Sequence, residues 1–471
     1  MFVLLTGVIL ACSVLTYVIP SGEYQRERKT VGSMTRTVVI PGTYSSEEKE
    51  YSFRGIVFGS EGEGASPVSA TQFLNAIPRG MERSAEIIFF TFIIGGVLGI
   101  LQRTGAVAAA IHKLIDKMGH RANLLTIILM VLMAIGGSTL GMGEEFIPLI
   151  PIFMIVSKSL GYDRVYGLGI VVLSAEIGFA AATTNPFTVN IAQGIAQLPL
   201  NNDIPFRLLF LAVCLTFSVA YLLRYGARIR RDPSLSLMAD DEFDISRQKL
   251  EKEELTRGHV LIIALSVVIF AFILFAVQTM DWWLPDMAGG FLLMGIVAKV
   301  VSGISWNDTA KAFVKGMEEM IVAALVIGFA RGIEVVLDDG KVMDTIIFSA
   351  ATVLQNFHTV VAAEGMFAFQ TMLNFLIPSG SGQAAVTMPL MAPLADVLGI
   401  SRQTAVFAFT CGDGFSNTIV PTSGLLMAFL SLAGVPYTTW LRFMFPPFLI
   451  LSFIAGLFVT VTVLFPGVWL W

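Results

Sequence analysis

The chain has 471 residues, of which 55% are hydrophobic and only 14% are charged. A soluble domain has roughly 25% charged residues, so this composition excludes an ordinary soluble protein and predicts an all-α protein that crosses a membrane several times. The net charge of −5 says little, because loop charges indicate orientation and are not summed. We expect no nucleic-acid partner, and the three cysteines lie in apolar segments without metal-ligand spacing. We expect no cofactor and no bound metal, apart from a coupling proton or sodium ion.

A membrane-spanning helix needs roughly 20 apolar residues. Taken in chain order, the segments that reach or approach this length are 2–19, 86–102, 105–118, 122–136, 165–198, 206–224, 258–278, 284–302, 320–337, 344–361, 362–377, 402–434 and 440–465. Segments 165–198 and 402–434 are interrupted, so we expect broken helices there. Segment 105–118 is short, and its second half carries several charges.

Two polar stretches predict the orientation in the membrane. Residues 20–70 carry mixed charges, whereas residues 225–257 hold a basic cluster made of Arg228, Arg230, Arg231, Arg247, Lys249, Lys252 and Arg257. Because basic residues concentrate in cytoplasmic loops, we expect 225–257 in the cytoplasm and 20–70 outside it. An odd number of crossings must then separate the two loops, and counting 105–118 as a crossing gives an odd number.

The two halves of the chain repeat each other. Residues 76–82 resemble residues 312–318, and further matches pair Gly96 with Gly332, Ser138 with Ser379, Gly141 with Gly382, Arg164 with Arg402, Glu176 with Asp413, and Gly178 with Gly414. An odd number of crossings between the copies turns the second copy upside down. Inverted repeats that contain broken helices are typical of alternating-access transporters.

Residues 137–160 and 378–398 are too short and too rich in Gly and Pro to span, so we interpret them as two re-entrant hairpins. The candidate solute-binding residues at their tips are Ser138, Thr139, Gly141, Gly143, Glu144, Glu145, Ser379, Gly380, Ser381, Gly382 and Gln383. The glycines allow backbone amides to approach a ligand. A half-helix that starts at such a tip presents free N–H groups, which suit a carboxylate; the alternative is that small residues only allow close helix packing.

The two broken helices supply a second set of candidates. Thr184 and Asn185 precede Pro186 in the first, and the second holds Ser416, Asn417, Thr418, Thr422 and Ser423 around Pro421. Proline stops a regular helix, and unwound carbonyls beside side-chain oxygens could coordinate a small cation. A purely structural proline kink is the alternative.

Four acids lie within these apolar segments: Glu144, Glu145, Glu176 and Asp413. A carboxylate at the bilayer centre costs roughly 2.5–3.5 kcal/mol on insertion scales. We therefore expect these side chains to line a hydrated cavity, bind a cation or proton, or pair internally. The candidates for ion or proton coupling are Glu144, Glu176, Asp413, Asn185 and Asn417.

These features predict a division of the chain into six parts. Residues 1–136 form first-repeat scaffold helices with loop 20–70, residues 137–198 hold the first hairpin and broken helix, and residues 199–257 form a helix and cytoplasmic linker. Residues 258–377 form second-repeat scaffold helices, residues 378–434 hold the second hairpin and broken helix, and residues 435–471 form the last helix.

The sequence 378–393, with 412–417 and 421–424, resembles the anaerobic C4-dicarboxylate carrier family, and within it the YfcC-like branch labelled as basic amino-acid antiporters. The family belongs to an ion transporter superfamily that includes the divalent anion/sodium symporters. The resemblance implies a homodimer in the bacterial inner membrane, with a scaffold domain and a transport domain that moves as an elevator. In sodium-coupled relatives, paired Ser-Asn-Thr motifs at hairpin tips bind carboxylate and sodium; here residues 416–418 spell the triplet within a broken helix instead.

The expected function is secondary transport of a small carboxylate-bearing solute. A cavity for dicarboxylate dianions should be poor in carboxylates, so Glu144, Glu145 and Asp413 favour exchange of arginine, ornithine or lysine. Proton- or sodium-coupled C4-dicarboxylate transport is the alternative, with the same acids carrying the coupling ion. We expect no enzyme activity, because Thr410 occupies the position where an intramembrane aspartyl protease motif needs glycine. Paired inverted hairpins also suit alternating access better than a continuous channel.

Overall fold

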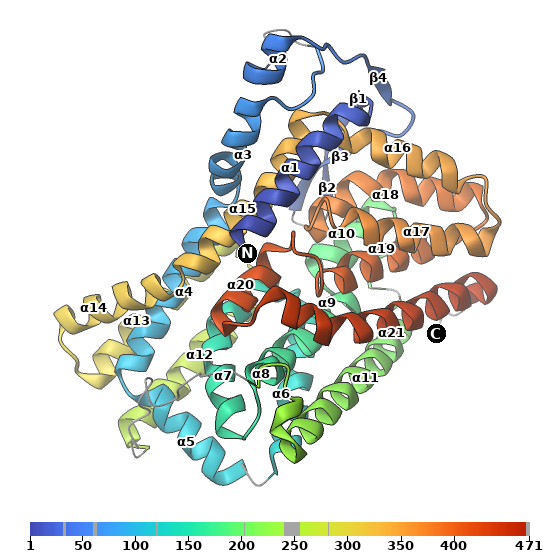
Figure 1. The fold of residues 1–471 in the computed structure, drawn as a ribbon. Helices are drawn as coiled ribbons and strands as arrows, with labels where there is room; N and C mark the ends of the chain where they lie inside the picture. Colours follow the sequence, from blue (N-terminus) through green and yellow to red (C-terminus); the bar gives the residue numbers. More distant parts are fainter. Residues whose placement is uncertain are drawn as a thin grey trace.

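The computed structural model describes residues 1–31, 34–59, 64–118, 121–201, 203–239, 255–280 and 282–467 (Figure 1). Residues 240–254, which hold Arg247, Lys249 and Lys252 of the basic cluster, lie outside the described residues. The fold is helical apart from two small two-stranded sheets, in which β1 pairs with β4 and β2 with β3, both antiparallel.

The first half of the chain contains the elements α1 (Phe2–Val18), β1 (Ser21–Glu23), β2 (Arg26–Val31), β3 (Met34–Val39), β4 (Ser45–Glu47), α2 (Phe53–Phe58), α3 (Ala70–Arg83), α4 (Ala85–Arg103), α5 (Ala106–Met118), α6 (Ala122–Ile135), η2 (Gly136–Leu140), η3 (Glu144–Leu149), α7 (Ile150–Ser159), α8 (Arg164–Val171), η4 (Val172–Glu176), α9 (Ile177–Ala180), η5 (Pro186–Asn190), α10 (Ile191–Ile195), α11 (Ile204–Arg231) and η6 (Pro233–Leu235).

The named elements of the second half are the α-helices α12 (Arg257–Thr279), α13 (Leu284–Ser302), α14 (Trp306–Glu319), α15 (Ile321–Asp339), α16 (Met343–Leu354), α17 (Thr359–Leu373), α18 (Gly380–Val397), α19 (Arg402–Ser416), α20 (Gly424–Ala433) and α21 (Tyr437–Leu464). Among the described residues, six helices are long and apolar enough to cross a membrane, or up to seven if the bent pair α14 and α15 forms one span. The predicted multi-pass helical architecture is therefore confirmed.

Two helix pairs from the two repeats cross each other at glycines. A Cβ on Gly80 of α3 would lie 2.5 Å from the carbonyl oxygen of Gly328 and 2.6 Å from the amide of Gly332, both on α15. A Cβ on Gly316 of α14 would lie 2.1 Å from the carbonyl oxygen of Gly95 on α4. Since Gly80 matches Gly316 in the repeat, the contact of α3 with α15 is the counterpart of the contact of α14 with α4.

Two arginines make a second reciprocal contact. Arg164, at the start of α8, donates from Nη1 to the carbonyl of Ala433 at the end of α20 (3.1 Å). Its repeat match Arg402, at the start of α19, donates from Nη1 to the carbonyl of Ala196 just after α10 (2.9 Å). Each repeat thus satisfies a carbonyl that a helix end of the other repeat leaves unpaired.

Two predicted crossings are wrong. Segment 105–118 is helix α5, which has 13 residues and fails the length and hydropathy required of a span. Segment 344–361 divides at residues 355–358 into the end of α16, which has only 12 residues, and the start of α17. At 1.5 Å per residue, helices of this length extend about 20 Å, well short of a hydrocarbon core of about 30 Å.

The predicted starts of both hairpins also need correction. The apolar helix α6 continues through η2 without a break as far as Leu140, so the boundary at 136/137 falls inside a helix. Glycines 136 and 137 pack closely there instead of breaking the chain; a Cβ on Gly137 would lie 2.2 Å from the carbonyl oxygen of Ala175. In the second half, residues 374–379 form the turn between α17 and α18, so the boundary at 377/378 falls at the tip and α17 is the first arm.

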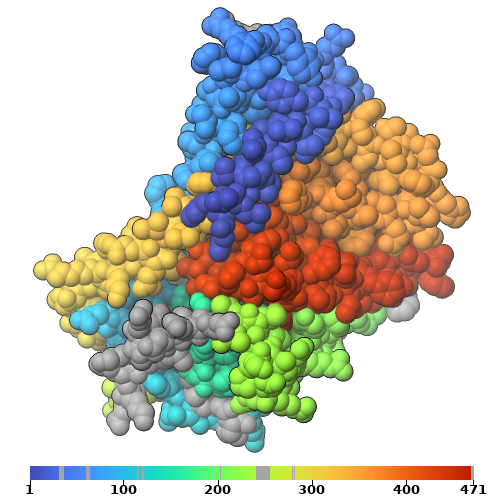
Figure 2. Space-filling view, viewed as in Figure 1, coloured from blue at the N-terminus to red at the C-terminus, as the bar shows by residue number. Residues whose placement is uncertain are grey.

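The polar stretch 20–70 forms β1 to β4 and α2 at one end of the molecule, while α5 and the end of α11 lie at the opposite end (Figure 1). The β2–β3 hairpin contacts the helical body: β3 packs on α18, and Lys29 of β2 donates from Nζ to the carbonyl of Ile195 (3.3 Å). Figure 2 shows α1 to α3 (blue) forming one end of the surface and α21 (red) crossing the middle between α17 (orange) and α11 (green). The core is a large apolar cluster that includes α8, α19 and α20.

Candidate functional site

A cavity of about 430 Å³ lies where the two halves meet. Both predicted hairpins and both broken helices contribute to its wall, and the predicted site residues that line it are Gly141, Gly143, Glu144, Glu145, Glu176, Ser379, Gly380, Ser381, Gly382, Asn417, Thr422 and Ser423. A volume of this size lies in the range of small-molecule sites, roughly 300–1,000 Å³. The tips predicted from separate halves of the sequence therefore share one space.

Other predicted residues lie behind this wall: Ser138, Thr139, Thr184, Asn185, Gln383, Asp413, Ser416 and Thr418 do not line the cavity. Most of them hold the backbone in place. Ser138 accepts a hydrogen bond from the amide of Thr183 (3.1 Å), and the hydroxyl of Thr184 donates to the carbonyl of Thr139 (3.2 Å). These bonds attach the first hairpin tip to the first helix break, which positions the residues that do face the cavity.

The second hairpin tip presents a helix N-terminus to the cavity. Ser379 is the N-cap of α18, and its hydroxyl accepts the amide of Gly382 (3.4 Å). In the described part of the chain, the amides of Gly380 and Ser381 have no acceptor, as expected for the first turn of a helix. The partial positive charge of the helix dipole adds to these free donors, so this end of the cavity suits an anionic group.

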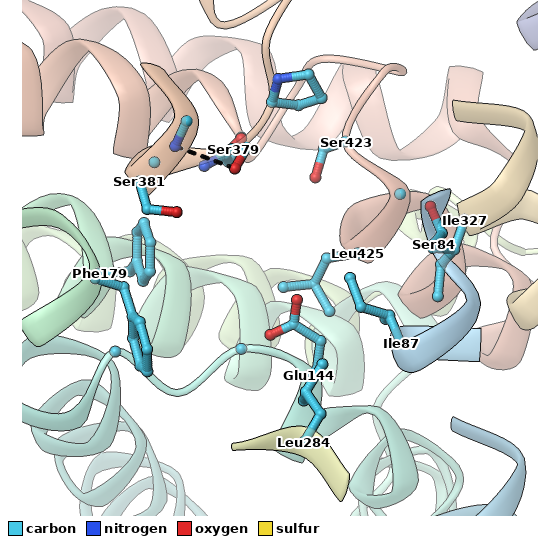
Figure 3. Close-up of a pocket in the computed structure, with 18 of the residues that line it drawn as sticks. Ser84, Ile87, Glu144, Phe179, Leu284, Ile327, Ser379, Ser381, Ser423 and Leu425 are labelled. Atoms are coloured by element: carbon cyan, nitrogen blue, oxygen red, sulfur yellow. Dashed lines mark hydrogen bonds between the residues drawn. The ribbon is translucent and has the colours of Figure 1, made fainter. Parts of the chain in front are cut away.

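The first hairpin tip presents acids. Gly141 ends η2 in the left-handed conformation (φ 69°), and Gly143 leads into η3 with Glu144 and Glu145 in its first turn. The carboxylate of Glu145 accepts the amide of Gly143 (2.8 Å), which folds that side chain over the loop. Glu144 is not held in this way, and Figure 3 shows its carboxylate pointing to the side of the cavity where Ser379 and Ser423 lie.

Asp413 lies directly beneath the second tip. Its side chain is fully buried, and neither carboxylate oxygen has a hydrogen-bond partner among the described residues. A Cβ on Gly380 would lie 3.0 Å from Asp413 Oδ2 and 2.7 Å from Thr188 Cγ2, so only glycine lets the tip sit so close. The hydroxyl of Thr188 is also buried without a partner in the described chain. A buried carboxylate in this state needs a proton or a cation, which supports Asp413 as a coupling candidate.

Sequence reasoning missed Asn374, which organises the second helix break. Its side-chain NH2 group lies within hydrogen-bonding distance of three acceptors: the carbonyl of Asp413 (2.9 Å), the hydroxyl of Ser416 (2.8 Å) and the side-chain oxygen of Asn417 (2.8 Å). Asn374 is itself fully buried. An asparagine in an otherwise apolar segment was the available signal, because a polar side chain at membrane depth requires partners.

The remaining wall comes from α15, from the start of α4, from the end of α12 and from residues of and near α13. Ile327, Ala330, Arg331 and Glu334 of α15 line the cavity, and Arg331 donates to Glu334 one turn away. Arg331 is the only basic residue among the described lining residues, whereas the lining acids are Glu144, Glu145, Glu176 and Glu334. The cavity is therefore rich in acidic side chains.

This helical fold and its cavity agree with the comparison to known proteins. The family model described as C4-dicarboxylate anaerobic carrier matches residues 1–464. The chain belongs to the C4-dicarboxylate anaerobic carrier family. Its membrane-embedded architecture is thus that of a transporter family, in line with the expectation that the chain is not an enzyme.

Two curated proteins are similar in sequence to this chain over most of their length. A protein of Escherichia coli (strain K12) named "Putative basic amino acid antiporter YfcC" is 32% identical over 465 residues, covering 93% of this chain and 91% of that protein. An uncharacterized protein of Haemophilus influenzae is 31% identical over 423 residues, covering 88% and 80%. The expected YfcC-like relationship within the C4-dicarboxylate anaerobic carrier family is confirmed.

Two solved transporters align over nearly the whole chain but only loosely. The YdaH transporter of Alcanivorax borkumensis has 15% identity and a TM-score of 0.44, with 99% of this chain and 98% of that chain covered. MtrF of Neisseria gonorrhoeae, described within a class of antimetabolite efflux pumps, has 17% identity and a TM-score of 0.43, with 98% and 94% covered.

Proposed function

We propose that this protein exchanges basic amino acids across the bacterial inner membrane. The observation that carries the proposal is the arrangement of polar groups in the cavity. The free amides at the N-terminus of α18 and the side chains of Glu144 and Glu176 line the same cavity. A solute with a carboxylate at one end and a cation at the other matches both. The amides of Gly380 and Ser381 hold the carboxylate, and the acids hold the guanidinium or ammonium of the side chain.

C4-dicarboxylate transport is the competing function, and the description of the family favours it. A dicarboxylate would bring two more negative charges into a cavity whose described lining already has four acids and one base. Like charges at this depth repel strongly. That function therefore requires several of the acids to be protonated or occupied by sodium. Under it, Glu144, Glu176 and Asp413 carry the coupling ions, with Asn185 and Asn417 near the two breaks as further ligands.

An elevator movement is consistent with the packing. The two hairpins, the two broken helices and the helices that hold them form the proposed transport domain, and α3, α4, α14 and α15 form the proposed scaffold. The reciprocal contacts of Gly80 and Gly316 support inverted repeats. If α6 and α7 are the two arms of one hairpin and α5 does not cross the membrane, two of the expected crossings, 105–118 and 122–136, are lost. The number of crossings between loops 20–70 and 225–257 then stays odd. We further propose that the protein acts as a homodimer.

Ligand-dependent stabilisation of the purified protein in detergent tests the solute class. A ligand that binds only the folded state stabilises it by about 2.7 kcal/mol at 100 times its Kd, so the unfolding midpoint rises with concentration. We expect arginine, ornithine and lysine to raise the midpoint and succinate and malate to leave it unchanged. Stabilisation by succinate or malate alone, including after addition of sodium or at lower pH, would replace amino-acid exchange by dicarboxylate transport.

A further inference from the structure

The part of the cavity wall formed by α15 carries two opposite charges side by side. Arg331 and Glu334 both line the cavity, and their side chains are 29% and 26% exposed. The two residues face the same side of the helix because they lie three positions apart. A solute in the cavity can therefore reach both of them.

Helix packing does not require this pair. Arg331 bonds Glu334 within the same helix, and such a contact stabilises a helix only slightly. The ion pairs that connect α15 to its neighbour lie at its end, where Arg79 and Arg83 of α3 bind Asp339 and Asp338. Removing the Arg331–Glu334 pair would thus leave the attachment of α15 to α3 intact.

The internal repeat also indicates that helix packing does not require this ion pair. Counting from the matched glycines Gly96 and Gly332, the positions in α4 that correspond to Arg331 and Glu334 are Gly95 and Leu98. Both are buried, and Gly95 is in close contact with α14. One repeat therefore builds the same helix crossing without any charge at these positions. Both α4, through Ser84 and Ile87 at its start, and α15 border the cavity, but the matched positions carry charge on α15 alone.

We propose that Arg331 and Glu334 bind the zwitterionic head of an α-amino acid, with Arg331 on the α-carboxylate and Glu334 on the α-ammonium group. This rests on the proposed amino-acid exchange and specifies how the solute is recognised. Adjacent opposite charges on the protein complement adjacent opposite charges on the solute. The α-carboxylate then receives the guanidinium from α15 and amides from the N-terminus of α18, while Glu144 and Glu176 meet the cationic side chain.

Binding in this way exchanges one ion pair for two. In the empty cavity, Arg331 and Glu334 neutralise each other. When the solute enters, its carboxylate takes over Arg331 and its ammonium group takes over Glu334, so neither protein charge is left unpaired at membrane depth. A dicarboxylate could replace only one half of the pair and would leave Glu334 facing a second anion. The pair therefore selects amino acids over dicarboxylates.

The test combines two variants with two solutes that each lack one charge. Proteoliposomes preloaded with ornithine take up labelled arginine, and unlabelled arginine, agmatine (no carboxylate) or Nα-acetylarginine (no ammonium group) compete. The wild type should prefer arginine to both analogues. Arg331→Gln should weaken the binding of arginine by about tenfold to a hundredfold, the range for hydrogen bonds to charged groups. The binding of agmatine should be nearly unchanged. Glu334→Gln should remove the preference over Nα-acetylarginine and retain the preference over agmatine.

Arg83→Gln is the matched control, because it removes an arginine that also pairs with α15 but lies outside the cavity lining. Its competition profile should equal that of the wild type. Should both analogue ratios stay at wild-type values in Arg331→Gln and Glu334→Gln while arginine still exchanges, the head-group assignment is wrong and the proposed function stands. If the variants aggregate, the same ratios measured for Arg331→Lys and Glu334→Asp decide. If the wild type ignores arginine, the proposed function and this assignment both fail.

Discussion

Two regions of the molecule treat the internal repeat differently. In the helix crossings, the repeats are equivalent: Gly80 of α3, which packs on α15, corresponds to Gly316 of α14, which packs on α4. The hydrogen bonds from Arg164 to Ala433 and from Arg402 to Ala196 correspond as well. At the cavity the repeats differ. The first hairpin brings two glutamates to its tip, whereas the positions that match Glu144 and Glu145 by the repeat are Ala385 and Val386.

This difference separates the requirements of folding from those of binding. The crossings depend on backbone contact, which both copies need equally, so small residues are kept in both. The cavity depends on charge, and a solute with two unlike ends needs two unlike walls. The first hairpin provides carboxylates, and the second hairpin provides backbone amides and hydroxyls. We therefore expect matched substitutions to have equal effects in the crossings and unequal effects in the cavity.

The largest effect is expected in the crossings. Gly80→Val and Gly316→Val place side-chain carbon within 2.5 Å and 2.1 Å of the facing carbonyl oxygens, so the helices must separate. Overpacking of this kind costs about 1–3 kcal/mol or more, and we expect both variants to lose most folded protein, to a similar extent. Size-exclusion chromatography and thermal unfolding in detergent measure this. Gly289→Ala is the control, since nothing lies within 4 Å of its Cβ; unequal loss in the two variants would contradict the equivalence.

Next in size is the loss of a carboxylate from the acidic wall. Glu144→Gln should weaken arginine exchange by about tenfold to a hundredfold, because hydrogen bonds to charged groups are worth about 1.5–3 kcal/mol, and thermal unfolding should be unchanged. Exchange kinetics over a range of arginine concentrations would show this as a raised KM. Glu318→Gln on the exposed face of α14 is the control. An unchanged KM in Glu144→Gln would show that the first hairpin does not recognise the charge of the solute.

A smaller effect is expected at the second hairpin. Ser381→Ala and Ser379→Ala leave the backbone amides of the tip in place, so each should reduce arginine affinity only about threefold to tenfold, the range for a neutral hydrogen bond. Ser379→Ala should also lower the unfolding midpoint, because Ser379 caps α18. Complete loss of exchange in Ser381→Ala with folded protein would mean that hydroxyls, not amides, hold the solute.

The smallest effect concerns pH and lies outside the cavity. The hydrogen bond from the Arg402 guanidinium lowers the pKa of Asp396 at the end of α18. A lowered folded pKa contributes stability above the unfolded value of about 3.9, and this contribution disappears as pH falls through the folded pKa. Both side chains are substantially exposed, so we expect less than about 1 kcal/mol. The difference in unfolding midpoint between wild type and Asp396→Asn should be present at pH 6 and should shrink as the pH falls below about 3.9; a difference that grows on acidification contradicts this.

Much of this arrangement could be predicted from the sequence, and the failures share a cause. Hydropathy located the long helices, and the repeated Gly, Ser and Asn residues located both breaks and both tips, because polar backbone at membrane depth is rare. Apolar composition alone does not fix the length of a helix, so it predicts membrane crossings at the short helices α5 and α16. Gly136 and Gly137 were taken for a break, although close packing against Ala175 keeps that segment helical.

The contents of the cavity wall were harder to predict than its tips. Asn374 acts through partners about 40 residues away in the sequence, and it belongs to no motif. Arg331 and Glu334 lie one turn apart on one helix, and only the three-dimensional fold places them beside the hairpins. Spacing along one helix can be read from the sequence, whereas the wall that a helix shares with distant segments cannot.

Counterflow tests the proposed exchange most directly. Proteoliposomes preloaded with ornithine are diluted into labelled arginine, with sodium and pH varied and no ion gradient imposed. We expect transient accumulation of arginine that requires internal ornithine and is unaffected by sodium. No accumulation of arginine, together with uptake of labelled succinate that malate inhibits and a sodium or proton gradient drives, would contradict amino-acid exchange and assign the cavity acids to the coupling ion.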